Sequence, residues 1–180
     1  MTQATPEELL DQAADWWSTS LIDIRPDVIR PRGIPIQDLI GTVGFVPMIW
    51  LMLRGELPAP AQAALLEAAL VAAVDHGPQA PSIAIARMAV TCGVGLNGAM
   101  ASAINVLGDV HGGAGEQCLA LYRQALAQVA EHGLEEGVER ALQAQVAAHG
   151  RIVPGFGHRF HRVDPRAVRL MALVESARAE

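Results

Sequence analysis

The chain of 180 residues contains no lysine, and all 13 of its basic residues are arginine. They are outnumbered by 19 acidic residues, which gives a formal net charge of −6 and an isoelectric point near 5.5. An acidic chain lacks the general attraction to phosphate groups on which nucleic-acid binders and proteins of anionic membranes depend. We therefore expect small molecules or proteins as partners, with no nucleic acid and no membrane among them.

Aromatic residues are also scarce, at 4%, although 51% of the residues are hydrophobic. The surplus is alanine, leucine, valine and isoleucine, and long stretches rich in Ala, Leu, Glu, Gln and Arg favour helices packed by small side chains. No stretch of four to eight residues alternates between polar and apolar as a half-buried strand does. The composition predicts an all-α fold of about eight helices and excludes a β-sandwich.

Cysteine and long apolar runs are likewise few. Cys92 and Cys118 lie in apolar helical patterns without the spacing of a metal or redox motif, so we interpret them as buried thiols in a reducing compartment. The most apolar runs, 45–53 and 59–74, are too short or too interrupted to cross ~30 Å of hydrocarbon. The acidic start lacks the basic flank and apolar run of a signal peptide, so we expect a cytoplasmic protein.

Turn and capping residues divide the chain into helices. The sequence Thr5-Pro6-Glu7-Glu8 predicts a helix start, and the segment 25–35, with three prolines and a glycine, predicts an extended arm. The segment 59–75 is apolar on nearly every face, which predicts a central helix surrounded by protein. Further helices are predicted from near 36 to 53 with a kink, at 83–91, 96–107, 114–131 and 134–149, and after Asp164-Pro165.

Four of the six histidines fall in segments that contain glycine or proline, at predicted helix ends rather than on helix faces: His76, His111, His158 and His161. Backbone groups at a helix end are accessible and partly unpaired, which places a neighbouring side chain well for binding a ligand. The alternative for each histidine taken alone is an ordinary polar residue at a turn.

His111 has the clearest physical argument, because a predicted helix begins at Ala114. The positive end of that helix disfavours an imidazolium, so His111 would stay neutral and donate a hydrogen bond to an oxygen that gains negative charge. Gly112 and Gly113 would let the main chain approach a substrate closely. The alternative is a glycine-rich turn with an incidental histidine.

The segment 151–169 concentrates positive charge, with five arginines against one aspartate and hence a net charge of +4. Arginine binds carboxylate or phosphate oxygens two at a time, so in an acidic protein this segment favours a small polyanionic ligand. The alternative is a solvated basic helix start.

Four segments, taken in order, resemble the citrate synthase superfamily. They are RGIPIQDLI with LRGELP in 32–58, DHGPQAPS at 75–82, GDVHGGAG at 108–115 and PGFGHRFHRVDPRA at 154–167. The resemblance implies a mostly helical homodimer whose large and small domains close over the active site, here 1–110 and an incomplete 111–180. It also implies a reaction that makes or breaks a carbon–carbon bond between an acyl-CoA and a 2-oxo acid.

The same resemblance assigns roles to individual residues. His111 matches the histidine that hydrogen-bonds the thioester carbonyl, and His158 matches the one that polarises the keto group of oxaloacetate. The positions expected to bind substrate carboxylates are His76, Arg159 and Arg166. The positions expected along CoA are Val153, Pro154, Gly155, Phe156, Gly157 and Arg162. CoA thioester is then a substrate, with no tightly bound cofactor and no metal.

The form Asp-His-Gly-Pro at 75–78 resembles citryl-CoA lyases and the lyase module of ATP-citrate lyase, so we expect a citryl-CoA lyase. Alternatives are a citrate or 2-methylcitrate synthase, a non-catalytic homologue that binds CoA or tricarboxylates, and a helical dimerisation module without a ligand. The family's catalytic aspartate lies downstream of the DPR segment, whereas the sequence stops at Glu180. We therefore expect the 180-residue chain alone to keep binding better than turnover, and neither Asp109 nor the helix-capping Asp164 is nominated as the base.

Overall fold

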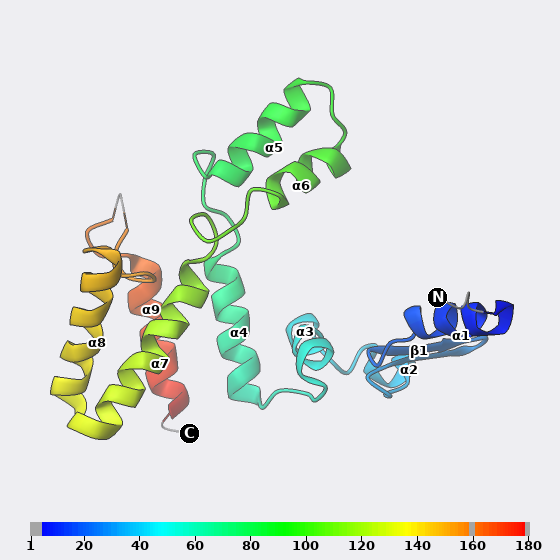
Figure 1. The fold of residues 1–180 in the computed structure, drawn as a ribbon, viewed down its shortest axis with the longest axis horizontal. Coiled ribbons are helices and arrows are strands. Elements are labelled where there is room, and N and C mark those ends of the chain that lie inside the picture. Colours follow the sequence, from blue (N-terminus) through cyan, green and yellow to red (C-terminus); the bar gives the residue numbers. More distant parts are fainter. Residues whose placement is uncertain (1–4, 159–160, 179–180) are drawn as a thin grey trace. The chain divides into compact units, whose positions relative to one another are not determined.

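The computed structural model describes residues 5–158 and 161–178, and within them it contains nine helices and one two-stranded hairpin (Figure 1). The predicted all-α fold is confirmed. In chain order the elements are α1 (Pro6–Trp16), β1 (Ile22–Arg25), β2 (Val28–Pro31), α2 (Ile36–Leu39), α3 (Phe45–Arg54), α4 (Pro60–Ala72), α5 (Pro81–Thr91), α6 (Leu96–Ile104), α7 (Ala114–His132), α8 (Leu134–His149) and α9 (Pro165–Arg178).

The chain divides into two compact units, one of Met1–Val71 with Ala172–Glu180 and the other of Ala72–Met171. These units do not coincide with the division at residue 110 expected from the sequence, and that division stays a prediction. No helix of the described residues is both long and apolar enough to span a membrane.

The first unit begins with the predicted capping box. The Thr5 hydroxyl accepts a hydrogen bond from the Glu8 amide at 3.3 Å, and the Glu8 carboxylate accepts one from the Thr5 amide at 2.7 Å. The hydrogen bond from the Thr5 amide, followed by the interaction with the Thr5 hydroxyl, favours the ionised carboxylate and lowers the pKa of Glu8. The start of α1 is therefore set by its own sequence, as predicted.

A β-hairpin, which the sequence did not predict, follows α1. Strands β1 and β2 pair antiparallel, from Ile22 opposite Pro31 to Arg25 opposite Val28. Pro26 and Asp27 form the turn, and Asp27 has a φ of 62°, as the second central residue of a type II turn requires. Each strand has only four residues, too few to show clear alternation, so the extended arm was predicted and its pairing was missed.

Arg32, at the end of the hairpin, joins this hairpin to α3. Its Nε and Nη2 atoms both donate hydrogen bonds to the main-chain carbonyl of Met52, the first at 3.0 Å. Met52 lies in the last turn of α3, where carbonyls have no partner within the helix. The guanidinium thus satisfies an acceptor that α3 leaves open.

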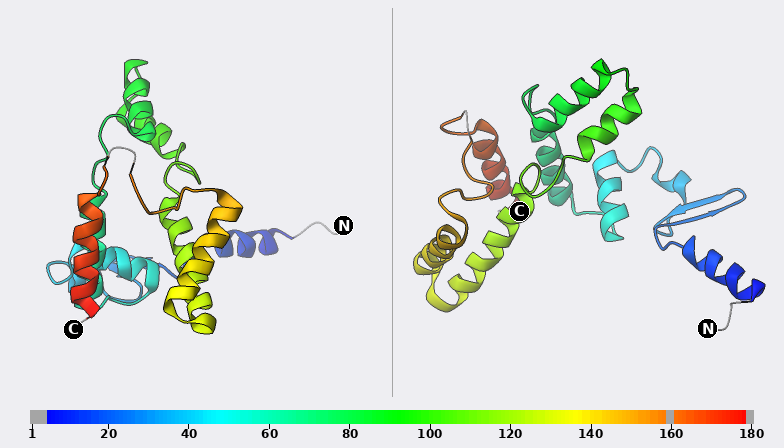
Figure 2. Two further views of the ribbon diagram at one scale, coloured as in Figure 1. Left: turned by 90° about the vertical axis from the view of Figure 1, so that its left-hand side faces the viewer. Right: turned by 45° about the horizontal axis from the view of Figure 1, so that its top comes forward.

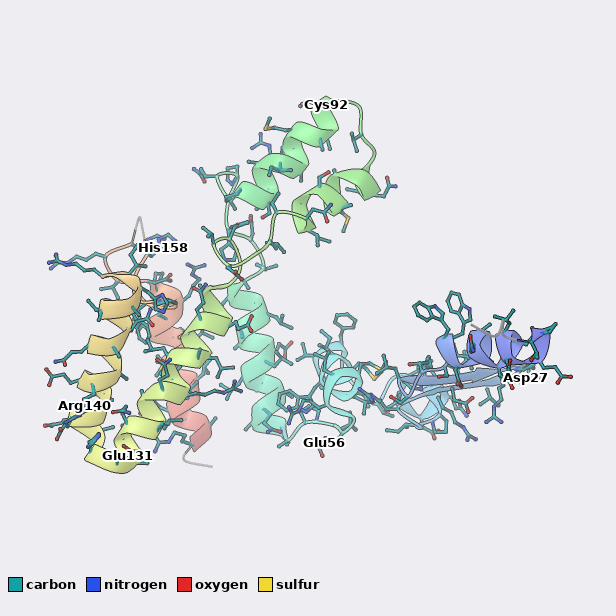
Figure 3. The ribbon with its side chains drawn as sticks, viewed as in Figure 1. Asp27, Glu56, Cys92, Glu131, Arg140 and His158 are labelled. Atoms are coloured by element: carbon teal, nitrogen blue, oxygen red, sulfur yellow. The ribbon has the colours of Figure 1, made fainter. Side chains whose placement is uncertain are left out.

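Burial in this chain differs from two of the predictions. Helix α4, expected to be surrounded by protein, has no buried residue, because the described chain supplies too few neighbours for a helix that is apolar on all sides. Cys92, expected to be buried, is exposed at the end of α5, at the tip of the α5–α6 hairpin (Figure 3). Cys118 is half-buried on α7.

The second unit contains two helical hairpins, α5–α6 and α7–α8 (Figure 2). Helices α7 and α8 run side by side and are joined by Gly133 alone, whose φ is 83°. They approach closely at Gly137, where an added Cβ atom would lie 2.4 Å from the Val129 nitrogen and 2.5 Å from its Cα. Leu121 and Ala141 are the buried apolar side chains of this pair.

We predict that Gly137→Ala destabilises the protein, because the new methyl group has to push α7 and α8 apart at a backbone contact. Overpacking of this kind costs about 1–3 kcal/mol. The matched control is Gly115→Ala, since an added Cβ at this other helical glycine meets nothing within 4 Å, and its expected effect is a gain of about 0.5–1 kcal/mol. Chemical denaturation measures both, and equal effects of the two variants would contradict the close approach.

Candidate functional site

A pocket of about 910 Å³ lies within the second unit. Its wall comes from three segments: residues 73–83 before and at the start of α5, the loop before α7, and the segment that leads into α9. Its volume is in the range of small-molecule sites. The polar lining residues are Asp75, His76, Gln79, Ser82, His111, His158, His161 and Arg166.

The pocket brings together four of the five residues predicted to act on the substrate. His76, His111, His158 and Arg166 all line it, although they come from segments far apart in the sequence. The fifth, Arg159, lies outside the described residues. Convergence of separate segments on one cavity is what a binding site requires and what isolated turn histidines would not produce.

The main chain fixes the orientation of His111. The backbone N–H of Ser82 donates a hydrogen bond to His111 Nε2 at 3.2 Å. Ser82 is the second residue of α5, so its amide has no acceptor within the helix, and no side chain caps this end. The bond requires a lone pair on Nε2, which assigns the neutral ring with its proton on Nδ1. The contact from the start of α5 thus leaves Nδ1 as the ring nitrogen that can donate a hydrogen bond.

The loop around His111 is a tight turn, and its two glycines, Gly112 and Gly113, are required for different reasons. The Gly108 amide donates to the His111 carbonyl at 2.9 Å, which closes the turn. Gly112 has a φ of 114°, a conformation open to glycine. Gly113 has an ordinary φ, but an added Cβ would lie 2.6 Å from the Asp109 carbonyl oxygen. At Gly113, the close approach predicted for the main chain is therefore to the Asp109 carbonyl of the same loop.

His158 is held by a second main-chain donor. The His161 amide donates to His158 Nδ1 at 3.3 Å, and the two rings stack with their centroids 4.6 Å apart. Nδ1 acts as the acceptor, so the neutral His158 ring carries its proton on Nε2. His161, grouped with the other turn histidines from the sequence but given no role there, also lines the pocket. The three-residue spacing of the two histidines was the signal available in the sequence.

Arg166 forms an ion pair with Asp164 at the start of α9. The Arg166 Nε and Nη2 atoms donate to the two Asp164 carboxylate oxygens at 3.0 and 2.6 Å, and the Arg166 amide donates to Oδ1 at 2.9 Å. The guanidinium hydrogen bonds hold the pKa of Asp164 well below its ordinary value and raise the pKa of Arg166. The prediction that Asp164 caps this helix is confirmed.

The loop predicted to lie along CoA packs on α7. Gly155 has a φ of 82°, and an added Cβ there would lie 2.5 Å from the Cys118 sulfur. The Phe156 ring contacts the Tyr122 ring one helical turn further along, with centroids 6.1 Å apart. Residues 153–157 and Arg162 do not line the pocket, so the structure places the predicted substrate residues together and the predicted CoA residues beside them.

No group of three or more His, Cys, Asp or Glu side chains lies close enough to hold a metal ion in the part of the chain that the structure describes. The chemistry that this pocket can carry out with its own residues is hydrogen-bond donation from two neutral imidazoles, together with carboxylate binding by a guanidinium.

Residues 58–180 match the family model described as citrate synthase, C-terminal domain. The chain belongs to the citrate synthase family. This assignment agrees with the motifs, since three of the four lie within the matched residues. Among curated proteins none matches this member of the family.

Solved structures extend the likeness over most of the chain. The citryl-CoA lyase from Hydrogenobacter thermophilus is 30% identical, with a TM-score of 0.77 over 91% of this chain and 62% of that one. Two ATP citrate lyases at 19% identity share the fold over 98% of this chain. They are a variant from Methanosaeta concilii in complex with (3S)-citryl-CoA, with a TM-score of 0.74, and the protein from Methanothrix soehngenii in complex with citrate and coenzyme A, with a TM-score of 0.75. This citrate synthase family chain covers 29% of each of these two lyases.

We predict that Gly155→Ala uncovers Cys118, because the added methyl group cannot share the space of the sulfur and the loop must lift. If the misfit costs about 1.4 kcal/mol, within the usual range for overpacking, modification of Cys118 by a thiol reagent becomes about tenfold faster. Exposed Cys92 gives an internal reference rate. Gly157→Ala is the control, since Gly157 has a similar φ of 80° but no neighbour within 4 Å. Equal Cys118 rates in the two variants would contradict the contact.

We also predict an acid-dependent contribution of the Asp164–Arg166 pair to stability. The pKa of Asp164 is lowered in the folded state from its ordinary value of 3.8, so its stabilisation is complete above that value and is lost as the pH falls below it. Thermal melts between pH 7 and 2 should show that wild type exceeds Arg166→Ala by a constant margin above about pH 5, and that the margin shrinks below about pH 4. A margin independent of pH would contradict this account.

Proposed function

We propose that this protein is an enzyme of the citryl-CoA lyase type. It would cleave (3S)-citryl-CoA, or a similar 3-hydroxy-3-carboxyacyl-CoA, into acetyl-CoA and oxaloacetate, or run the reverse condensation. The observation that carries the proposal is the meeting of His76, His111, His158 and Arg166 in one pocket. The citryl-CoA lyase likeness, over 91% of the chain, supports the same reaction class.

In this proposal His111 acts on the thioester. Cleavage breaks the carbon–carbon bond and passes its electron pair to the acetyl-CoA fragment, whose thioester oxygen becomes an enolate oxygen. The Nδ1 proton of His111 donates to that oxygen, because Ser82 occupies Nε2. A fixed donor that meets developing charge lowers the barrier without having to reorient during the reaction.

His158 acts at the other product in the same step. As the bond breaks, the 3-hydroxyl gives its proton to solvent water and its oxygen becomes the keto oxygen of oxaloacetate, and the enolate carbon of the other fragment takes up a proton from water to give acetyl-CoA. The Nε2 proton of His158 would donate to this oxygen, since the His161 amide holds Nδ1. Arg166 and His76 would bind the carboxylates, and Arg166 supplies the permanent positive charge among the described lining residues.

CoA would extend from the pocket along residues 153–157 and Arg162, as a substrate rather than a bound cofactor. The relatives solved with (3S)-citryl-CoA, or with citrate and coenzyme A, support this ligand class. A homodimer in the cytoplasm stays part of the proposal. It is favoured by the exposed apolar side chains along one face of α8, namely Leu134, Val138, Leu142 and Val146.

Two other functions within the family are tested by the same experiments. A citrate or 2-methylcitrate synthase would condense acyl-CoA with oxaloacetate and release free CoA, and a non-catalytic homologue would bind citrate or CoA without turnover. Calorimetry with citrate and with CoA tests binding, and release of oxaloacetate from (3S)-citryl-CoA tests cleavage. Both should use the full-length native polypeptide. Binding of neither ligand would reject the whole proposal, and binding without cleavage or condensation would select the non-catalytic homologue.

We predict that His111→Ala lowers turnover of that polypeptide by about 10²-fold or more, the usual scale for one donor to an oxyanion. Citrate affinity should change much less, because the donor acts on charge that develops only during the reaction. His111→Gln is the control for structure: its amide oxygen can accept from Ser82 while its amide nitrogen donates, so it should retain part of the rate. Turnover equal to wild type in His111→Gln would indicate that His111 serves only to cap α5, and turnover equal to wild type in His111→Ala would contradict the donor role.

A further inference from the structure

Among the lining residues that the structure describes, Arg166 carries the permanent positive charge, and its side chain is held in one orientation. The Asp164 carboxylate accepts from Nε and Nη2 along one edge of the guanidinium. Asp164 itself is not among the residues that line the pocket. Arg166 is therefore the member of the pair that faces the cavity, and Asp164 is the member that holds the Arg166 side chain.

The position of Asp164 does not depend on the guanidinium. Its Oδ1 accepts the Arg166 backbone N–H at 2.9 Å at the start of α9, and Pro165 occupies the first helical position. The Asp164 side chain is also the less exposed of the two, at 17% against 36% for Arg166. A helix cap thus anchors the carboxylate, and the carboxylate in turn anchors the arginine.

We propose that Asp164 is a positioning residue, which holds the Nε edge of Arg166 so that the opposite edge is presented to a carboxylate of the ligand. A guanidinium has five N–H donors, of which Asp164 accepts two. Those that remain, on Nη1 and on the outer side of Nη2, form a parallel pair suited to one carboxylate. The proposal rests on the proposed function only in taking citrate or oxaloacetate as the ligand.

The opposite role for Asp164 makes the opposite prediction. If Asp164 competed with the ligand for Arg166, removing its charge would strengthen anion binding. The guanidinium donors would be freed, and the electrostatic potential around them would become more positive. If Asp164 orients the fork, the same change weakens binding despite the more positive field. The sign of the change in affinity therefore distinguishes the two roles.

The test is Asp164→Asn in the full-length protein, with citrate as the calorimetric probe at a temperature well below both melting transitions. The Asn oxygen can still cap α9, but its amide group faces Nη2 with a donor instead of an acceptor. We expect citrate to bind about tenfold more weakly, the scale of one hydrogen bond to a charged group. In the Arg166→Ala background the same substitution should have almost no further effect on citrate binding.

Tighter or unchanged citrate binding in Asp164→Asn would overturn the proposal, as would a full loss in the Arg166→Ala background. A second readout does not depend on the ligand. The Arg166 Nε–H resonance should exchange slowly with water in the wild type and fast in Asp164→Asn, and equal exchange would also overturn the proposal. A wild type that binds neither citrate nor CoA would reject the proposed function and the carboxylate ligand, whereas Nε–H exchange would still decide whether Asp164 fixes the fork.

Discussion

The pocket depends on main-chain amides that occupy one nitrogen of each of two histidine rings. The Ser82 amide takes Nε2 of His111, and the His161 amide takes Nδ1 of His158. Because an imidazole that accepts on one nitrogen can donate only from the other, the backbone decides which atom of each ring can act. The two rings accept on opposite nitrogens, and both rings line the same cavity.

Three glycines of this unit support the same arrangement because they leave room for neighbouring atoms, and not only because their backbone is flexible. Gly113 leaves room for the Asp109 carbonyl, Gly155 for the Cys118 sulfur and Gly137 for the Val129 backbone. In each place a methyl group would lie closer than 3 Å to a neighbouring atom. The turn that carries His111, the loop that leads to His158 and the α7–α8 pair are therefore held by close contacts that no other residue permits.

Much of this could be predicted from the sequence, because the relevant signals are local. Capping residues marked α1 and α9, and the glycine and proline contexts singled out His76, His111 and His158. The β1–β2 pairing was missed because four-residue strands show almost no period, and the burial of Cys92 was predicted wrongly because an apolar neighbourhood in sequence does not supply a neighbour in space. The role of Ser82 was beyond reach, since it depends on where α5 begins relative to a loop 29 residues away.

The hydrogen bond between Ser82 and His111 also connects α5 to the pocket. One end of this helix donates to the ring, and the other end carries Cys92 at the exposed tip of the α5–α6 hairpin. With eleven residues at 1.5 Å each, α5 is about 16 Å long. A ligand that fixes the His111 ring would thereby also fix the start of α5, the end of the helix that lies away from Cys92.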